Sequence, residues 1–274
     1  MSLIEEVMRR QAHERAAMPG GLAANAGGAA RVARPILAPA PETQVQQYRA
    51  AAVDGEALER NRVLLRVQDV AVSRAYKILR TRVLHRMAEN NWFTLGITGT
   101  GVGEGKTTTA INLAIALAQD PNAWVFLVDL DLQRPQLGAY LGMSYEHGLT
   151  DFLTGQAELE QVVYDIGIRR LGVVPNASPV ETSSEHLRSA RMADFINVLE
   201  SQTPRRIVIF DMPPIMVSDD VLAFAPRVDS FLLVASQGIT ARRTLANARE
   251  VLSELNLLGV VLNRSTEHND SPYY

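Results

Sequence analysis

Short hydrophobic runs alternate with segments of helical periodicity along most of the chain. The runs are five or six residues long and predict strands at Phe93–Thr98, Val125–Asp129, Leu171–Pro175, Ile207–Asp211, Phe231–Ala235 and Gly259–Asn263. Apolar positions three or four residues apart predict helices between several of them, including 75–87 and 107–119. Because strands alternate with helices, the pattern predicts an α/β fold with a mostly parallel sheet and helices on both faces.

The first sixty residues do not follow this pattern. Ala, Gly and Pro dominate between Ala16 and Pro41, a composition that is typical of a flexible linker. Ahead of the linker, apolar residues at helical spacing indicate either a frayed tail or a short docking helix, at Leu3, Ile4, Val7 and Met8. We therefore predict a flexible arm over 1–60, one domain over 61–263 and a tail over 264–274.

Composition and charge exclude several classes of protein. The 274 residues contain no cysteine, which excludes disulfide scaffolds, thiolate metal sites and cysteine nucleophiles. The five histidines are scattered, so a catalytic metal is expected to be a hard ion with oxygen ligands. A net charge of -3 does not favour nucleic acid, and no apolar run approaches the roughly 20 residues of a membrane span. Glu5 and Glu6 argue against a secretory signal.

The glycine-rich segment from Gly99 to Thr108 lies between a predicted strand and a predicted helix. This context is typical of a phosphate-binding loop, whose backbone N–H groups surround an anion at a helix N-terminus. The pattern places Lys106 on the β- and γ-phosphates and the Thr107 hydroxyl on Mg²⁺. Its first glycine is displaced, because Thr100 stands at the pattern position and Gly99 precedes it. The predicted nucleotide-binding residues are Gly101, Gly103, Glu104, Gly105, Lys106, Thr107 and Thr108.

Three aspartates follow predicted strands directly. Asp129 and Asp131 end one hydrophobic run, and Asp211 ends another before a double proline. The carboxyl ends of parallel strands lie at one edge of the sheet, so we expect these carboxylates to converge near the phosphate loop. The alternative for any one of them is a strand-end Asp that caps the next turn.

These motifs together resemble the cytoplasmic domain of the bacterial tyrosine kinases (BY-kinases), in which they form the Walker A, A′ and B boxes. The matching segments are Gly103–Thr107 with Ala110–Ala114, Asp129–Pro135 and Asp211–Pro214, and weaker agreement extends the resemblance over about residues 70 to 274. The resemblance implies a P-loop NTPase-type fold, an autokinase activity and the cofactors ATP and Mg²⁺. The family regulates the assembly of exopolysaccharide and capsule.

The resemblance also implies roles for individual residues. Lys106 and Thr107 would bind ATP–Mg²⁺, with Asp131 and Asp211 holding the metal directly or through water. Asp129 would be the base for the tyrosine hydroxyl, because a phenol with a pKa near ~10 needs a positioned proton acceptor. Asn263 is similar in its position to the family's adenine-contacting Asn, although a strand-end Asn is also an ordinary turn residue.

Two departures from the family concern charge. Gln133 stands where the family typically has Arg, and the guanidinium comes one residue later at Arg134. A helical Glu-x-x-Arg-x-x-Arg motif that promotes ring assembly aligns with Arg74, Lys77 and Arg80. Because Arg replaces the Glu, the ion pairs between neighbouring copies lose their acidic partner, so the usual ring of a homo-oligomer is not assumed.

The C-terminal tail has two tyrosines, Tyr273 and Tyr274, where the family has a cluster of phosphoacceptors. The alternative is two incidental aromatic residues. If the last predicted strand ends at the catalytic edge, the eleven residues from Arg264 to Tyr274 can extend at most about 40 Å. The tail could then visit its own site or that of a neighbouring copy.

The leading hypothesis is an ATP- and Mg²⁺-dependent protein-tyrosine autokinase of an exopolysaccharide export system. Family behaviour implies a cytoplasmic protein that associates with the inner membrane through a membrane-spanning chain-length regulator. One rival is a positioning ATPase of the MinD/ParA kind, which usually carries a second Lys where this chain has Gly101. The other rival is a kinase-dead subunit that binds ATP only to dock its partner, an alternative that Gln133 and the short tyrosine tail keep open.

Overall fold

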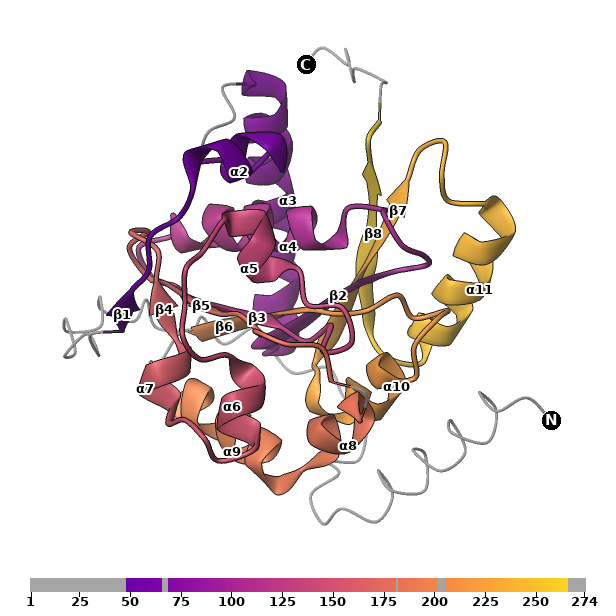
Figure 1. Ribbon diagram of the computed structural model, residues 1–274. Helices are drawn as coiled ribbons and strands as arrows, with labels where there is room; N and C mark the ends of the chain where they lie inside the picture. The colour runs from indigo at the N-terminus through magenta and orange to yellow at the C-terminus, as the bar shows by residue number, and fades with distance from the viewer. Residues whose placement is uncertain (1–47, 66–68, 181, 202–205, 266–274) are drawn as a thin grey trace, which may run out of the picture. The chain divides into compact units, whose positions relative to one another are not determined.

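The computed structural model describes residues 48–65, 69–180, 182–201 and 206–265 (Figure 1). The chain divides into Met1–Glu42 and Thr43–Tyr274, and the first of these units lies wholly outside the described residues. The same holds for the N-terminal segment that is either a frayed tail or a docking helix, for the predicted linker, and for the two tail tyrosines, Tyr273 and Tyr274. The fold is therefore that of the second unit.

The described part of the second unit contains one eight-stranded sheet in the order β1-β4-β5-β3-β6-β2-β7-β8. Neighbouring strands are parallel except β4 and β5, which are antiparallel. The strands are β1 (Arg49–Ala50), β2 (Thr94–Gly99), β3 (Trp124–Asp129), β4 (Tyr164–Asp165), β5 (Leu171–Val174), β6 (Arg206–Asp211), β7 (Ser230–Ser236) and β8 (Leu257–Asn263). All six predicted strands are confirmed, whereas β1 and β4 have two residues each and carry no periodic signal.

Helices connect the strands and cover both faces of the sheet (Figure 1). They are α2 (Gly55–Arg60), α3 (Val70–Asn90), α4 (Lys106–Ala118), α5 (Leu137–Leu141), α6 (Leu149–Leu153), α7 (Leu159–Val162), α8 (Ser183–Arg188), α9 (Ala190–Ser201), α10 (Asp220–Phe224), the 3₁₀ helix η1 (Ala225–Arg227) and α11 (Arg242–Ser253). This arrangement confirms the predicted α/β fold. Among the described residues, no helix is both long and apolar enough to cross a membrane.

Alternate residues of the central strands pack on opposite faces of the sheet. On one face Val125 and Leu127 of β3 join a core that includes residues of α3 and α4. On the other face Phe210 of β6 contacts Phe224 of α10 edge-to-face, with ring centroids 4.9 Å apart. Because both faces are covered, these strands read in the sequence as continuous hydrophobic runs, which is why the sequence predicts them correctly.

The segment before α3 is part of the core, which corrects the predicted domain boundary at residue 60. β1 pairs with β4, and Ala57 and Leu58 of α2 are buried at 2% and 3% exposure. Val63 is fully buried. The sequence does not indicate this segment, because its apolar residues are mostly alanines and form no clear periodic pattern. The domain therefore begins before residue 60, within the compact unit Thr43–Tyr274.

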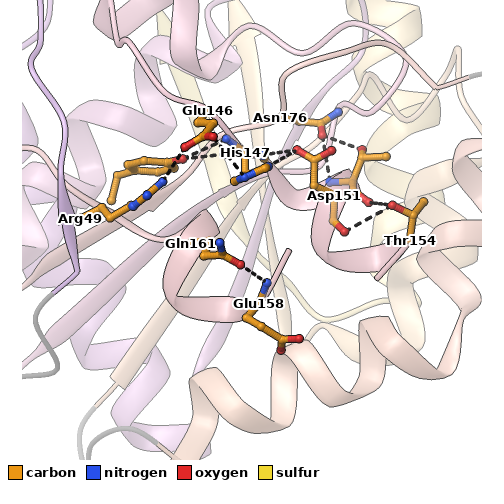
Figure 2. A network of polar contacts seen from close by, with 11 residues as sticks. Arg49, Glu146, His147, Asp151, Thr154, Glu158, Gln161 and Asn176 are labelled. Carbon is orange, nitrogen blue, oxygen red and sulfur yellow. Dashed lines mark hydrogen bonds and ion pairs between the residues drawn. The ribbon is translucent and has the colours of Figure 1, made fainter. Parts of the chain in front are cut away.

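Polar contacts fasten this early segment to the rest of the domain. Arg49 pairs with Glu146, with 2.9 Å between Nη1 and Oε2, and Figure 2 shows this pair next to His147 and Asp151. Asp151 accepts a hydrogen bond from the Gly148 N–H at the start of α6. These contacts join β1 to the α5–α6 connection, across 97 residues of sequence.

Hydrogen bonds also join the early segment to α4, the helix that follows the phosphate loop. The Asn112 amide, in the middle of α4, accepts from the Leu64 N–H at 2.8 Å and donates to the Arg62 carbonyl at 3.0 Å. Asn112 is 1% exposed, so its side chain satisfies two backbone groups that would otherwise lose their hydrogen bonds on burial. The segment before α3 is thus bonded directly to α4.

Candidate functional site

Three adjacent strands end at one edge of the sheet and bring the predicted site residues together. β2 leads through the glycine-rich loop into α4, which begins at Lys106. On the neighbouring strands Asp129 and Asp211 lie opposite each other in register. The strand order therefore produces the convergence of the carboxylates and the loop that the sequence predicts.

The glycines of the loop provide backbone conformations that other residues rarely adopt. Gly103 has φ +77° and Gly105 has φ +91°, both in the left-handed region. Gly105 also lies against β8, because an added Cβ would clash with the Asn263 Nδ2 atom. Lys106, 9% exposed, follows it, and Thr107 and Thr108 lie half-buried in the first turn of α4.

Glu104 is the centre of a buried hydrogen-bond cluster inside the loop. Its carboxylate accepts the N–H groups of Thr100 (2.6 Å) and Gly101 (3.0 Å) and the hydroxyl of Thr240 (2.5 Å). Burial acts to raise the pKa of Glu104, but these hydrogen bonds outweigh it and hold the pKa below its ordinary value. The first amides of the loop are therefore occupied unless Glu104 moves.

The carbonyl groups of the loop accept hydrogen bonds from charged and amide side chains. Lys106 Nζ donates to the Gly101 carbonyl at 3.2 Å. Asn263 Nδ2 donates to the Glu104 carbonyl, and Arg264 Nη2 to the Gly103 carbonyl, each at 3.0 Å. The end of β8 thus supports the loop. Asn263 lies at the site, as the sequence predicts, but it contacts the loop backbone; its contact with adenine stays a prediction.

Asp211 has the features of a metal-binding carboxylate. Its Oδ1 atom is buried without a hydrogen-bond partner among the described residues, and the Thr107 hydroxyl bonds to the carboxylate. Burial raises the pKa of Asp211 to about 7, although the Thr107 hydrogen bond and the Lys106 charge oppose this rise. An ion held by Thr107 and Asp211 would satisfy the orphaned oxygen.

The other two aspartates differ in their environment. Asp129 is fully buried, and its oxygens accept the backbone N–H groups of Asp131 (3.2 Å), Gln136 (3.1 Å) and Leu137 (3.0 Å). Burial, followed by the nearby Asp211 charge, raises its pKa well above the ordinary value. Asp131 is only partly buried and accepts from the Arg134 N–H at 3.1 Å. In this structure Asp129 therefore holds the turn that follows β3 through its hydrogen bonds. Its role as a base stays a prediction.

Gln133 points to an acidic partner that the sequence does not indicate. Its Nε2 atom donates to Asp220 Oδ2 at 3.2 Å and to Ser183 Oγ at 3.0 Å. Asp220 is fully buried, and burial raises its pKa while the Ser183 hydroxyl opposes the rise. Burial raises the pKa of Asp131, and the charge of the neighbouring Arg134 partly opposes this rise. The side chain at position 133 therefore donates a hydrogen bond to the buried Asp220 carboxylate at the start of α10.

This contact gives a stability prediction for Gln133→Arg. A guanidinium next to Asp220 would replace a neutral donor with a charged one, so we expect the free energy of unfolding at pH 7.5 to rise by about 1 kcal/mol. Urea denaturation measures the change. In an Asp220→Asn background the same substitution should bring no gain, and an equal gain there would contradict the pairing.

A second prediction concerns pH. The raised pKa of Asp211 means that the folded protein binds a proton that the unfolded chain releases above about pH 4. Without Mg²⁺ and nucleotide, stability should therefore fall as the pH rises from about 4 to about 7, by at most ~1.4 kcal/mol per pH unit for this group. Asp129 shifts in the same direction. Urea unfolding between these pH values measures the slope, which Asp211→Asn should reduce; a rising curve would contradict the assignment.

The fold and the loop define a nucleotide-binding protein of the P-loop class. Residues 95–273 match the CbiA family, the CobQ/CobB/MinD/ParA nucleotide binding domain. The MinD protein of Pyrococcus horikoshii OT3, complexed with Mg-ADP, has a TM-score of 0.54 at 24% identity over 65% of this chain and 72% of MinD. The chain belongs to this family, and MinD shares its fold.

Two relatives narrow the assignment. The chain is 30% identical over 224 residues to the tyrosine-protein kinase YwqD of Bacillus subtilis (strain 168), covering 80% of this chain and 93% of YwqD. The kinase domain of the Escherichia coli tyrosine kinase ETK has a TM-score of 0.65 at 28% identity, covering 73% of this chain and 78% of that domain. Within the nucleotide-binding family, the chain therefore belongs to the bacterial tyrosine-protein kinases.

Several contacts of the site have no counterpart in the sequence analysis. Thr240, from the connection after β7, completes the Glu104 cluster. Ser183 and Asp220 hold Gln133, and Arg264 supports the loop at Gly103. No local pattern predicts them, because each contact joins residues that are far apart in the chain.

Proposed function

We propose that this chain is an ATP- and Mg²⁺-dependent protein-tyrosine kinase that phosphorylates tyrosines of its own C-terminal tail, Tyr273 and Tyr274. The observation that carries the proposal is the convergence of Lys106, Thr107 and Asp211 around a buried carboxylate oxygen with no partner among the described residues. Membership of the tyrosine-kinase family supports the reaction class.

The residues present fit a magnesium–nucleotide complex. Mg²⁺ usually keeps several waters and takes one or two carboxylates, a hydroxyl and phosphate oxygens from its surroundings. Thr107 offers the hydroxyl, and Asp131 and Asp211 offer the carboxylates. No group of three or more His, Asp or Glu side chains in the described part of the chain forms a complete metal cage. When bound, Mg²⁺–ATP supplies the γ-phosphoryl group and neutralises its charge.

The chain's own residues would then position and stabilise the reactants. Lys106, at the start of α4, would exchange its hydrogen bond to the Gly101 carbonyl for the phosphate oxygens. The positive end of the α4 dipole, at its N-terminus, would also stabilise the phosphates. The tyrosine hydroxyl must lose a proton as it attacks. Asp129 is the proposed acceptor, and it can act only if the turn that follows β3 opens, because its oxygens now bind backbone N–H groups.

The proposed setting is an exopolysaccharide or capsule export system. Family resemblance supports a cytoplasmic protein that reaches the inner membrane through a membrane-spanning chain-length regulator. The arm that precedes the domain is the proposed docking element. A homo-oligomer is compatible with the fold, but Arg74 at the ring motif argues against the usual ion pairs between copies.

One experiment tests the kinase activity. The purified chain is incubated with ATP and Mg²⁺, and phosphotyrosine is mapped by mass spectrometry. We expect phosphate on Tyr273 and Tyr274, its loss in the double Phe variant, and its loss in Lys106→Met. Arg86→Met is the control, because Arg86 is exposed near the end of α3 just before β2 begins, at the edge of the sheet opposite the loop, and it should leave phosphorylation unchanged.

The rivals predict different results in the same experiment. A MinD/ParA-like switch hydrolyses ATP without phosphorylating tyrosine, and the fold similarity to MinD supports testing it. A kinase-dead subunit binds nucleotide and does neither. Phosphate release without phosphotyrosine would favour the switch, and nucleotide binding alone would favour the subunit.

A further inference from the structure

One face of α3 presents a stripe of exposed basic and apolar side chains. α3 packs against α4 through Val83 and Met87, which are 0% and 3% exposed. On the opposite side, residues three or four positions apart point outward, at Val70, Arg74, Lys77, Ile78, Arg82 and His85, and all six are exposed. We call these six residues the outer face of α3.

The charge of this helix is opposite in sign to that of the whole chain. α3 contains five Lys or Arg residues and one acidic residue, Glu89, whereas the chain has a net charge of -3. The carboxylate of Glu89 pairs with His85 at 3.2 Å. The charged ends of Lys77 and Arg82 make no hydrogen bond or ion pair with the described residues, so they are available to an external anion.

Apolar side chains are exposed among these cations. Val70, at the start of the helix, is 80% exposed, and Ile78, in the middle of the outer face, is 37% exposed. Leu65, just before the helix, is 41% exposed. An α-helix of this length extends about 32 Å, so the outer face is a long rigid surface that combines positive charge with apolar side chains.

We propose that the outer face of α3 binds the surface of a bilayer that contains anionic phospholipids. Basic side chains bind lipid phosphates, and apolar side chains of the same helix face enter the headgroup region. Lipid phosphates are mobile and match cations at any spacing, whereas a protein partner needs a fixed acidic pattern that complements Lys77 and Arg82. The inference is independent of the proposed kinase activity and adds a direct lipid contact to partner-mediated recruitment.

Vesicle co-sedimentation of the full chain tests this contact. The vesicles contain phosphatidylcholine alone or with about 30% phosphatidylglycerol, at low and high salt. We expect binding only to the anionic vesicles at low salt. Lys77→Glu with Arg82→Glu should weaken the partition coefficient about thirtyfold or more, because each cation near an anionic surface contributes about a factor of five.

The matched control is Arg243→Glu with Arg249→Glu on α11, which makes the same charge change at exposed positions elsewhere. This pair should retain most of the binding. Equal losses in the two double variants would overturn the proposal, because net charge or the first 47 residues would then govern binding. Binding that does not depend on phosphatidylglycerol would also overturn it. So would unchanged vesicle binding in Lys77→Glu/Arg82→Glu together with a smaller oligomer by light scattering, because the face would then join two copies.

Discussion

Asp211→Asn is expected to lower the rate of tyrosine phosphorylation at least about a thousandfold while leaving the apo domain at least as stable as the parent. Removing a preorganised electrostatic contact to a phosphoryl group costs about two to three orders of magnitude, and loss of metal binding adds to it. The fold tolerates the change, because Asn is nearly isosteric and can still accept the Thr107 hydroxyl. The rate of phosphotyrosine formation by quantitative mass spectrometry measures the first effect.

The expected stability of Asp211→Asn follows from the burial of the Asp211 carboxylate. Asp211 is 2% exposed, and its raised pKa shows that the folded environment disfavours the carboxylate. A neutral amide removes the repulsion with Asp129, so the free energy of unfolding at pH 8 should rise by up to about 1 kcal/mol without Mg²⁺. Activity and stability thus move in opposite directions.

Asp219→Asn provides the matched control for Asp211→Asn. Asp219 lies eight residues later in the chain and is exposed, so the same chemical change there should alter neither rate nor stability. A large loss of stability in Asp211→Asn would show that the carboxylate holds the fold together. Full Mg²⁺-dependent activity in that variant would remove Asp211 from the metal site.

The sequence predicts the central part of the sheet correctly for a physical reason. β3 and β6 are buried on both faces, so their residues are continuously apolar, and the following Asp129 and Asp211 mark the strand ends. The same reasoning predicts α4, because a glycine loop precedes a long helical run. Local patterns suffice wherever burial and chain direction determine the residue types.

The contacts that organise the site are not predictable from local patterns. The bonds Gln133–Asp220, Glu104–Thr240 and Asn263–Glu104 span 87, 136 and 159 residues. From the sequence alone, Gln133 indicates only that the Arg typical of the family is missing at this position. Only the fold shows that its partner is a buried carboxylate on α10, so the substitution is a change in how that carboxylate is satisfied.

The early segment gives the second large effect, in a comparison of two truncations. Removing residues 1–47 leaves every contact between the described residues in place, so we expect the free energy of unfolding to change by less than about 0.5 kcal/mol. Removing residues 1–60 also deletes β1 and α2, with the buried Ala57 and Leu58. We expect a loss of about 3–5 kcal/mol, the cost typical of deleting one buried leucine with its contacts.

The physical cause is the surface that α2 covers. Ala57 packs against Gly142 after α5, where an added Cβ would approach the Ala57 Cβ to 2.9 Å, and the Asp54 N–H donates to the Leu141 carbonyl at 3.2 Å. α5 follows the turn that Asp129 holds, so the longer truncation should also weaken nucleotide binding. Urea denaturation and nucleotide titration of both truncations measure these effects. Leu58→Ala in the full chain is the matched point variant and should cost about 3 kcal/mol. Equal stability of the two truncations would return the domain boundary to residue 60, because the packing of Leu58 would then contribute nothing to the fold.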